Sequence, residues 1–178
     1  MCPRCWRQPS PLTRSRAIGP YDGTLRTIVH ALKYDGCRSL ARGLGLRLRE
    51  SAADVLAGAD IAVPVPLHRG RRRTRGFNQA GELAGALGVT VVHALRRTRA
   101  TPSQTDLPAD ARHDNMRNAF ALRRVPWRTK IEGLRIVLVD DVSTTGATLE
   151  ACAAVLRAAG AAEVSAVTAA RVVSRSTG

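Results

Sequence analysis

The chain has few aromatic residues, no long apolar run and no recognisable leader. Aromatic residues make up 3% of its 178 residues, so alanine, valine and leucine must fill most of a hydrophobic core. No apolar run approaches the roughly 20 residues that a membrane-spanning helix needs, so we expect no membrane insertion. No charged n-region followed by an apolar h-region opens the chain, and we therefore expect a cytoplasmic protein.

Acidic residues are also few relative to basic ones. The chain has 28 lysines and arginines against 14 aspartates and glutamates, which gives a formal net charge of +14 at pH 7. Only Lys33 and Lys130 are lysines, so arginine supplies almost all of the positive charge. This excess predicts attraction to polyanions, either a nucleic acid or a heavily phosphorylated small ligand.

Cysteine is scarce, and its spacing leaves three interpretations open. Cys2 and Cys5 form a Cys-x-x-Cys pair, whereas Cys37 and Cys152 stand alone. Such a pair supplies two of the four ligands of a structural zinc site. It could also be a pair of inert thiols or a redox pair, although no thioredoxin-like context follows it. We expect no well-formed zinc site, and Zn²⁺ at Cys2 and Cys5 only if other ligands complete the site.

The most informative stretch is 135–149, Arg-Ile-Val-Leu-Val-Asp-Asp-Val-Ser-Thr-Thr-Gly-Ala-Thr-Leu. Its apolar residues 136–139 predict a strand that is buried on both faces. Asp140 and Asp141 follow, and then a small polar turn leads into a helical pattern. In an α/β protein this order points backbone N–H groups and a helix N-terminus at a phosphate. The carboxylates would then face ribose hydroxyls or Mg²⁺, and the plainer alternative is an ordinary helix N-cap.

This stretch closely resembles the phosphoribosyl-pyrophosphate (PRPP) loop of type I phosphoribosyltransferases. It lacks the Gly-Lys-Thr ending of a Walker loop. The resemblance implies that Asp140 and Asp141 are the catalytic acidic pair that binds the ribose hydroxyls. It also implies a 5-phosphate site formed by Ser143, Thr144, Thr145, Gly146, Ala147 and Thr148.

A basic loop follows a second predicted strand. Residues 61–65 are apolar, and the prolines at 64 and 66 end the strand there. The following loop carries five arginines in seven positions from Arg69 to Arg75. A run of arginines is commonly a solvated face. This run lies where open α/β sheets bind ligands, however, and guanidinium groups suit a pyrophosphate.

Several shorter motifs narrow the resemblance to the ComF family (ComFC/GntX-like), phosphoribosyltransferase homologues known from DNA uptake. They are Val-Pro-Val-Pro-Leu-His, Arg-Gly-Phe-Asn-Gln, Leu32-Lys33-Tyr34, Arg99-x₄-Gln104, Arg112-x-x-Asn115 and Ala119-Phe120, and with the PRPP loop they span about residues 20–172. The resemblance implies a three-layer α/β fold with a mostly parallel central sheet, flanking helices and a flexible hood loop. It departs at the N-terminus, where the family usually carries a four-cysteine zinc finger.

The resemblance also implies roles for the two remaining loops. The pyrophosphate would bind at Leu67, His68, Arg69, Arg75 and Gly76. Residues 96–120 are long, polar and rich in turns, as in loops that close over a ligand. In this hood loop the implied site residues are Arg99, Gln104, Arg112 and Asn115, although Arg112 and Asn115 could equally be a surface pair on one helix face.

The remaining patterns outline the domain. We expect residues 1–19 to be a remnant zinc-finger-like segment with a linker, and residues 20–178 to be the phosphoribosyltransferase-like domain. The periodicity predicts helices over 22–34, 38–56 and 79–87, a strand over 89–92, a last strand over 163–173 and a linker over 8–20.

Two functions of different class are consistent with these features. The first is a phosphoribosyltransferase that takes PRPP with Mg²⁺ and releases pyrophosphate, with an acceptor that the sequence does not identify. The second is a non-catalytic competence accessory protein that binds single-stranded DNA and a ComFA-like helicase. Its nucleic-acid contacts would come from Arg71, Arg72, Arg73, Arg96 and Arg97. The sequence predicts no oligomeric state.

Overall fold

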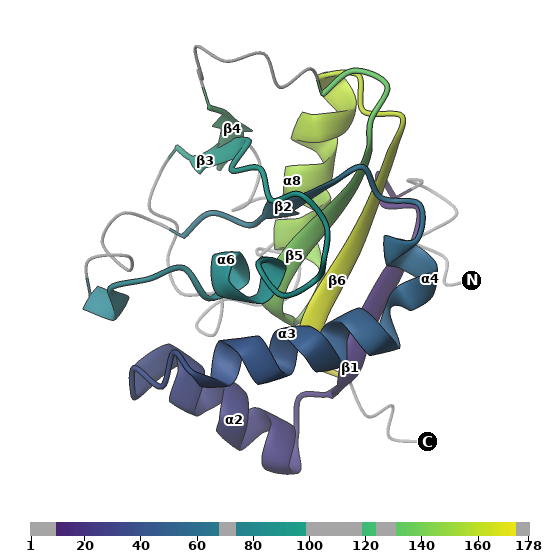
Figure 1. Cartoon of the computed structure of the whole chain (residues 1–178). Coiled ribbons are helices and arrows are strands. Elements are labelled where there is room, and N and C mark those ends of the chain that lie inside the picture. Colours follow the sequence, from purple (N-terminus) through teal and green to yellow (C-terminus); the bar gives the residue numbers. More distant parts are fainter. Residues whose placement is uncertain (1–9, 68–73, 99–118, 124–130, 174–178) are drawn as a thin grey trace, which may run out of the picture.

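A computed structural model describes residues 10–67, 74–98, 119–123 and 131–173 of the chain (Figure 1). The order of its elements is β1 (Ser15–Pro20), α2 (Gly23–Tyr34), α3 (Leu40–Ser51), α4 (Ala53–Leu56), β2 (Ile61–Pro64), α6 (Gln79–Ala84), β3 (Leu95–Arg97), β4 (Phe120–Leu122), β5 (Arg135–Ser143), α8 (Ala147–Ala158) and β6 (Glu163–Arg171). Among these described residues no helix is long and apolar enough to cross a membrane.

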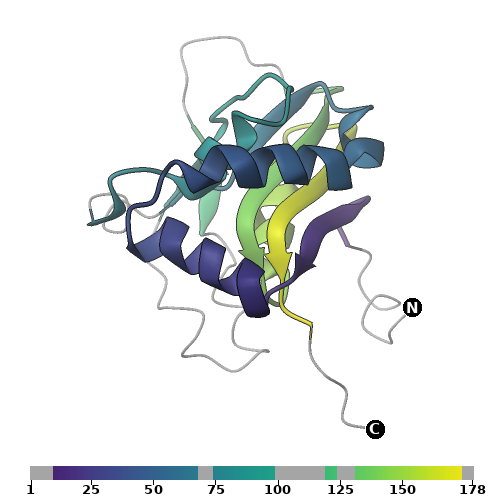
Figure 2. The same ribbon diagram turned by 60° about the horizontal axis from the view of Figure 1, so that its bottom comes forward.

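The main sheet has four parallel strands in the order β1-β6-β5-β2. Alternate side chains of β5 enter two separate cores. Ile136 and Leu138 pack with α8 and with the antiparallel β3–β4 ribbon. Val137 and Val139 pack with α2, α3 and α6 on the opposite face. Helices therefore cover both faces of the sheet (Figures 1 and 2), which confirms the predicted three-layer α/β architecture.

The connections place a topological switch between β2 and β5. These strands are neighbours, and they pair in register from Ile61 opposite Ile136 to Pro64 opposite Val139. The chain leaves β2 toward α6 on one face and leaves β5 toward α8 on the other. The two loops diverge at the carboxyl edge of the sheet, which is where doubly wound α/β proteins bind their ligands.

Several sequence-based expectations about elements are wrong or incomplete. The linker expected over 8–20 contains β1, which pairs with β6 from Ser15 opposite Ala166 to Pro20 opposite Arg171. This strand was not predicted because it contains polar residues and ends in a proline. Both are tolerated on an edge strand. The strand expected over 89–92 is a single bridge between Val91 and Ala62. The strand expected over 136–139 is longer, because β5 continues through the acidic pair to Ser143.

Candidate functional site

The turn between β5 and α8 is shaped by one glycine. Gly146 is the N-cap of α8 and has a φ of 82°, a left-handed conformation that glycine adopts without strain. No side chain caps this helix at Gly146, so backbone donors of the first turn are directed at the loop. The Ala147 N–H lies 3.4 Å from the Thr145 hydroxyl oxygen. A helix N-terminus after such a turn is the kind of place where anions bind in α/β proteins, and the 5-phosphate site here stays a prediction.

The loop and one of the two carboxylates line a common pocket. Its walls are Asp140, Val142, Ser143, Thr144, Gly146, Ala147, Thr148 and Leu149. The enclosed space measures about 10 Å³, so it is a narrow notch at the end of the sheet. The structure therefore brings most of the predicted 5-phosphate residues together with Asp140.

Asp140 has an unusual ionisation behaviour. Burial, followed by the charge of Asp141, raises its pKa to about 7 from an ordinary value of 3.8. The Asp141 backbone N–H, which donates to Asp140 Oδ1 at 2.9 Å, and the cations Lys33 and Arg97 act in the opposite direction. Asp140 is thus divided between its protonated and ionised forms near neutral pH.

Asp141 is held by a different partner. Its Oδ1 lies 2.8 Å from the Lys33 ammonium nitrogen, and the side chains of Asp141 and Lys33 are only 12% and 16% exposed. Neighbouring residues of a strand direct their side chains to opposite faces, so the two carboxylates do not point the same way. Lys33 belongs to the Leu32-Lys33-Tyr34 motif of the family resemblance, but its sequence context predicted no site role for it. The feature that distinguishes Lys33 in the sequence is that it is one of only two lysines in the chain.

Arg97 lies beside Asp140 rather than on an open surface. Its guanidinium carbon lies 5.5 Å from the centre of the Phe120 ring, and its charge lowers the pKa of Asp140. Cys152 of α8 shares this environment, and burial followed by the Asp140 charge raises the pKa of its thiol. Arg96 is exposed and donates from Nε to the Leu122 carbonyl at 3.3 Å. Of these two nucleic-acid candidates, Arg96 is exposed and Arg97 is half-buried.

The loop after β2 is described in part. The Arg75 guanidinium lies 5.0 Å from the centre of the Tyr34 ring and 3.5 Å from Gln79 Oε1. Asn78 donates to the Val65 carbonyl at 3.1 Å and so fixes the end of β2. Gly76 adopts a φ of 75° with open space around it, and Leu67 is half-buried. Other predicted residues lie outside the described part of the chain, namely Cys2, Cys5, His68, Arg69, Arg71, Arg72, Arg73, Arg99, Gln104, Arg112 and Asn115.

Metal ligands are sparse within the described ranges. No group of three or more histidine, cysteine, aspartate or glutamate residues there could hold an ion. Cys37 is an exposed free thiol and Cys152 is a buried one. Mg²⁺ usually binds through one or two carboxylates together with substrate phosphates. Asp140 beside the phosphate-type loop fits that mode of binding.

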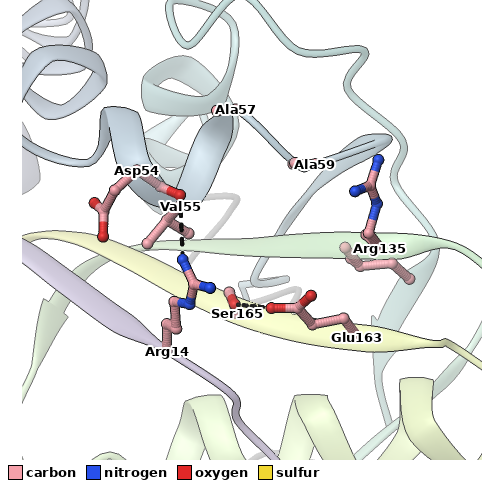
Figure 3. A pocket seen from close by; sticks show the side chains of 10 residues that line it. Arg14, Asp54, Val55, Ala57, Ala59, Arg135, Glu163 and Ser165 are labelled. Carbon is pink, nitrogen blue, oxygen red and sulfur yellow. Dashed lines mark hydrogen bonds between the residues drawn. The ribbon is translucent and has the colours of Figure 1, made fainter.

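A second cavity lies at the opposite end of the strands, where β5 and β6 begin (Figure 3). It measures about 300 Å³, and its polar lining includes Arg14, Asp54, Glu163 and Ser165. Arg14 donates to the Asp54 carbonyl at 3.4 Å, and the Ser165 hydroxyl donates to Glu163 at 3.3 Å. This cavity faces the amino ends of the strands, so it is separate from the loops after β2 and β5.

The fold is an α/β fold of the phosphoribosyltransferase type, and the sequence agrees. The chain belongs to the phosphoribosyl transferase domain family, which it matches over residues 73–176. It is 34% identical to DNA utilization protein YhgH of Salmonella typhi, an alignment that covers 92% of this chain and 74% of that protein. It is 32% identical to Competence protein F of Haemophilus influenzae, with 92% and 75% of the two chains covered. These relatives confirm the ComF family resemblance.

One solved structure is similar in its backbone. It is the glutamine PRPP amidotransferase from B. subtilis complexed with ADP and GMP, with a TM-score of 0.48 and 25% identity. The similarity covers 74% of this chain and 26% of that chain.

Proposed function

We propose that this chain binds PRPP with Mg²⁺ and transfers its phosphoribosyl group to an acceptor with release of pyrophosphate. The observation that carries the proposal is the shared pocket of Asp140 and the 143–148 loop at the N-terminus of α8. A helix N-terminus suits the 5-phosphate, and a carboxylate next to it suits the ribose hydroxyls. The acceptor is unassigned, and the same site would also serve a protein that senses PRPP.

The reaction would proceed by positioning and charge stabilisation. The bond between C1 of the ribose and the pyrophosphate oxygen breaks, and the acceptor's lone pair forms the new bond to C1. The negative charge leaves with pyrophosphate, where guanidinium groups such as Arg75 stabilise it. Mg²⁺ would supply further positive charge to the phosphates, and Asp140 is the carboxylate that would hold it.

Calorimetric titration of PRPP with Mg²⁺ tests this proposal. We expect the unmodified chain to bind with roughly micromolar affinity and the D140N/D141N variant to lose at least 100-fold. Asp54→Asn is the matched control, because Asp54 is exposed and pairs with Arg16. Its affinity should remain unchanged. Absence of PRPP binding by the folded, unmodified chain would contradict the proposal.

A second candidate function is supported by the formal charge of +14 and by the printed names of the relatives. In that function the chain would bind single-stranded DNA as an accessory protein for DNA uptake or use. Both functions could coexist. A fluorescence anisotropy titration of a labelled oligonucleotide, with and without saturating PRPP, distinguishes one shared site from two independent ones.

A further inference from the structure

We infer that the last turn of α2 forms part of this site, beside the loops after β2 and β5. In this turn Lys33 positions Asp141 and compensates its charge. The inference rests on the proposed function, because it assigns a role at the same site. Helix α2 ends at Tyr34, and its residues Val29 and Leu32 are fully buried against the sheet. This packing fixes the backbone from which Lys33 extends, so the ammonium group has a defined position.

The ion pair restrains Asp141 in one orientation. Both side chains are mostly buried, and a carboxylate that loses a partner in such a place is left uncompensated. Lys33 contacts Oδ1 of Asp141 at 2.8 Å. A carboxylate has two oxygens with about four acceptor positions, so Oδ2 retains the capacity to accept a ribose hydroxyl. Lys33 thus holds the carboxylate in place while leaving it able to bind sugar.

The charge of Lys33 has a second consequence. PRPP is a polyanion, and two adjacent carboxylates at the rim of its site would repel it. The Lys33 ammonium nitrogen lies 2.8 Å from Asp141 Oδ1, so its positive charge acts directly on the acidic pair. The pair can therefore accept hydroxyl groups without presenting its full negative charge to the ligand.

The same turn reaches the other loop. Tyr34 follows Lys33 directly, and its ring lies 5.0 Å from the Arg75 guanidinium carbon. Tyr34 remains 63% exposed. One helical turn therefore contacts the acidic end of β5 through Lys33 and the basic loop after β2 through Tyr34. It is placed to set the separation between the sugar and pyrophosphate halves of a bound ligand.

The test compares Lys33→Gln and Lys33→Arg with the unmodified chain by calorimetry, using three probes. The probes are PRPP with Mg²⁺, ribose 5-phosphate and inorganic phosphate. We expect K33Q to weaken PRPP and ribose 5-phosphate at least 10-fold, and K33R to stay within threefold of the unmodified chain. Inorganic phosphate, which needs only the 143–148 loop, should be unaffected. Arg26→Gln is the control, because Arg26 is an exposed cation on the same helix.

A double-mutant cycle separates positioning from a general charge effect. If Lys33 acts through Asp141, the loss caused by K33Q disappears in a D141N background. If Lys33 merely attracts anions, K33Q weakens inorganic phosphate as well and does so in both backgrounds, which overturns the inference. Lys33→Met keeps the aliphatic stem and serves in place of K33Q if that variant does not fold.

The outcomes distinguish this inference from the proposed function. If the unmodified chain binds neither PRPP nor ribose 5-phosphate, the proposed function fails. If it binds both and K33Q binds them equally well, the proposed function stands and the role of Lys33 is refuted.

Discussion

Asp140 is the residue whose chemistry depends most on its surroundings. Burial and the neighbouring Asp141 raise its pKa to about 7, so its charge changes within the physiological range. Ribose hydroxyls and Mg²⁺ both prefer the ionised carboxylate. Cations placed beside Asp140 therefore determine how readily the site can bind its ligand at neutral pH.

The raised pKa predicts how stability depends on pH. The pKa of Asp140 is about 7 in the folded protein and 3.8 without its surroundings, so the folded protein retains a proton that the unfolded chain has released between these values. Stability should therefore fall as pH rises from about 4 to 7. Asp140→Asn should remove this decline, which urea unfolding from pH 4 to 8 measures. An unchanged slope in D140N would show that other groups cause the decline.

At the level of single residues, motifs predicted the loop better than they predicted its partners. Gly146 and its neighbours stand in a contiguous pattern whose geometry follows from local sequence. Lys33 lies 108 positions from its carboxylate partner Asp141, and Arg97 lies 43 positions from Asp140. Their roles depend on how helices and ribbons pack, which no local pattern specifies.

At the level of elements, close contact between α3 and α6 depends on one glycine. A Cβ atom on Gly45 would lie 2.6 Å from Ala86 Cβ and 2.9 Å from the Leu83 carbonyl oxygen. Gly43 lies two residues earlier in α3, and a Cβ atom added to it would have no other atom within 4 Å. The two glycines therefore provide a matched pair for measuring the packing of this layer.

Gly45→Ala should destabilise the protein by about 1–3 kcal/mol, because the added methyl group overpacks the α3–α6 contact. Gly43→Ala should instead stabilise it by about 0.5–1 kcal/mol, since alanine reduces the conformational entropy of the unfolded chain and suits a helix. Chemical unfolding of both variants measures the difference. Equal effects of the same sign would mean that α3 and α6 do not pack as closely as described.

The predictability of elements followed their hydrophobic patterns. The buried strand β2 and the helices α2, α6 and α8 carry strong apolar periodicity, and their positions were predicted closely. The edge strand β1 and the short ribbon of β3 and β4 were not recognised. These elements are short or polar, and their pairing comes from long-range contacts rather than from the segments themselves.

At the scale of the whole molecule, the positive charge is not confined to the candidate site. Exposed arginines occur on β1, α2, α3, β5 and α8, at Arg16, Arg26, Arg47, Arg135 and Arg157. A site for one phosphorylated sugar needs cations in one place, whereas a chain of phosphates can use cations spread over a surface. The distribution therefore favours a general attraction to polyanions in addition to the site at the carboxyl edge.

This distribution of positive charge predicts how the chain should bind an oligonucleotide in the presence and absence of PRPP. A single-stranded oligonucleotide should bind the whole chain with an affinity that falls steeply with salt, by roughly 0.7 in the log–log slope for each phosphate contact. Saturating PRPP with Mg²⁺ should leave that affinity within twofold, because most of the contributing arginines lie away from the loop after β5. K33Q should likewise have little effect on the oligonucleotide. If PRPP displaces the oligonucleotide instead, the two ligands share the carboxyl edge, and the surface charge is not what binds the nucleic acid.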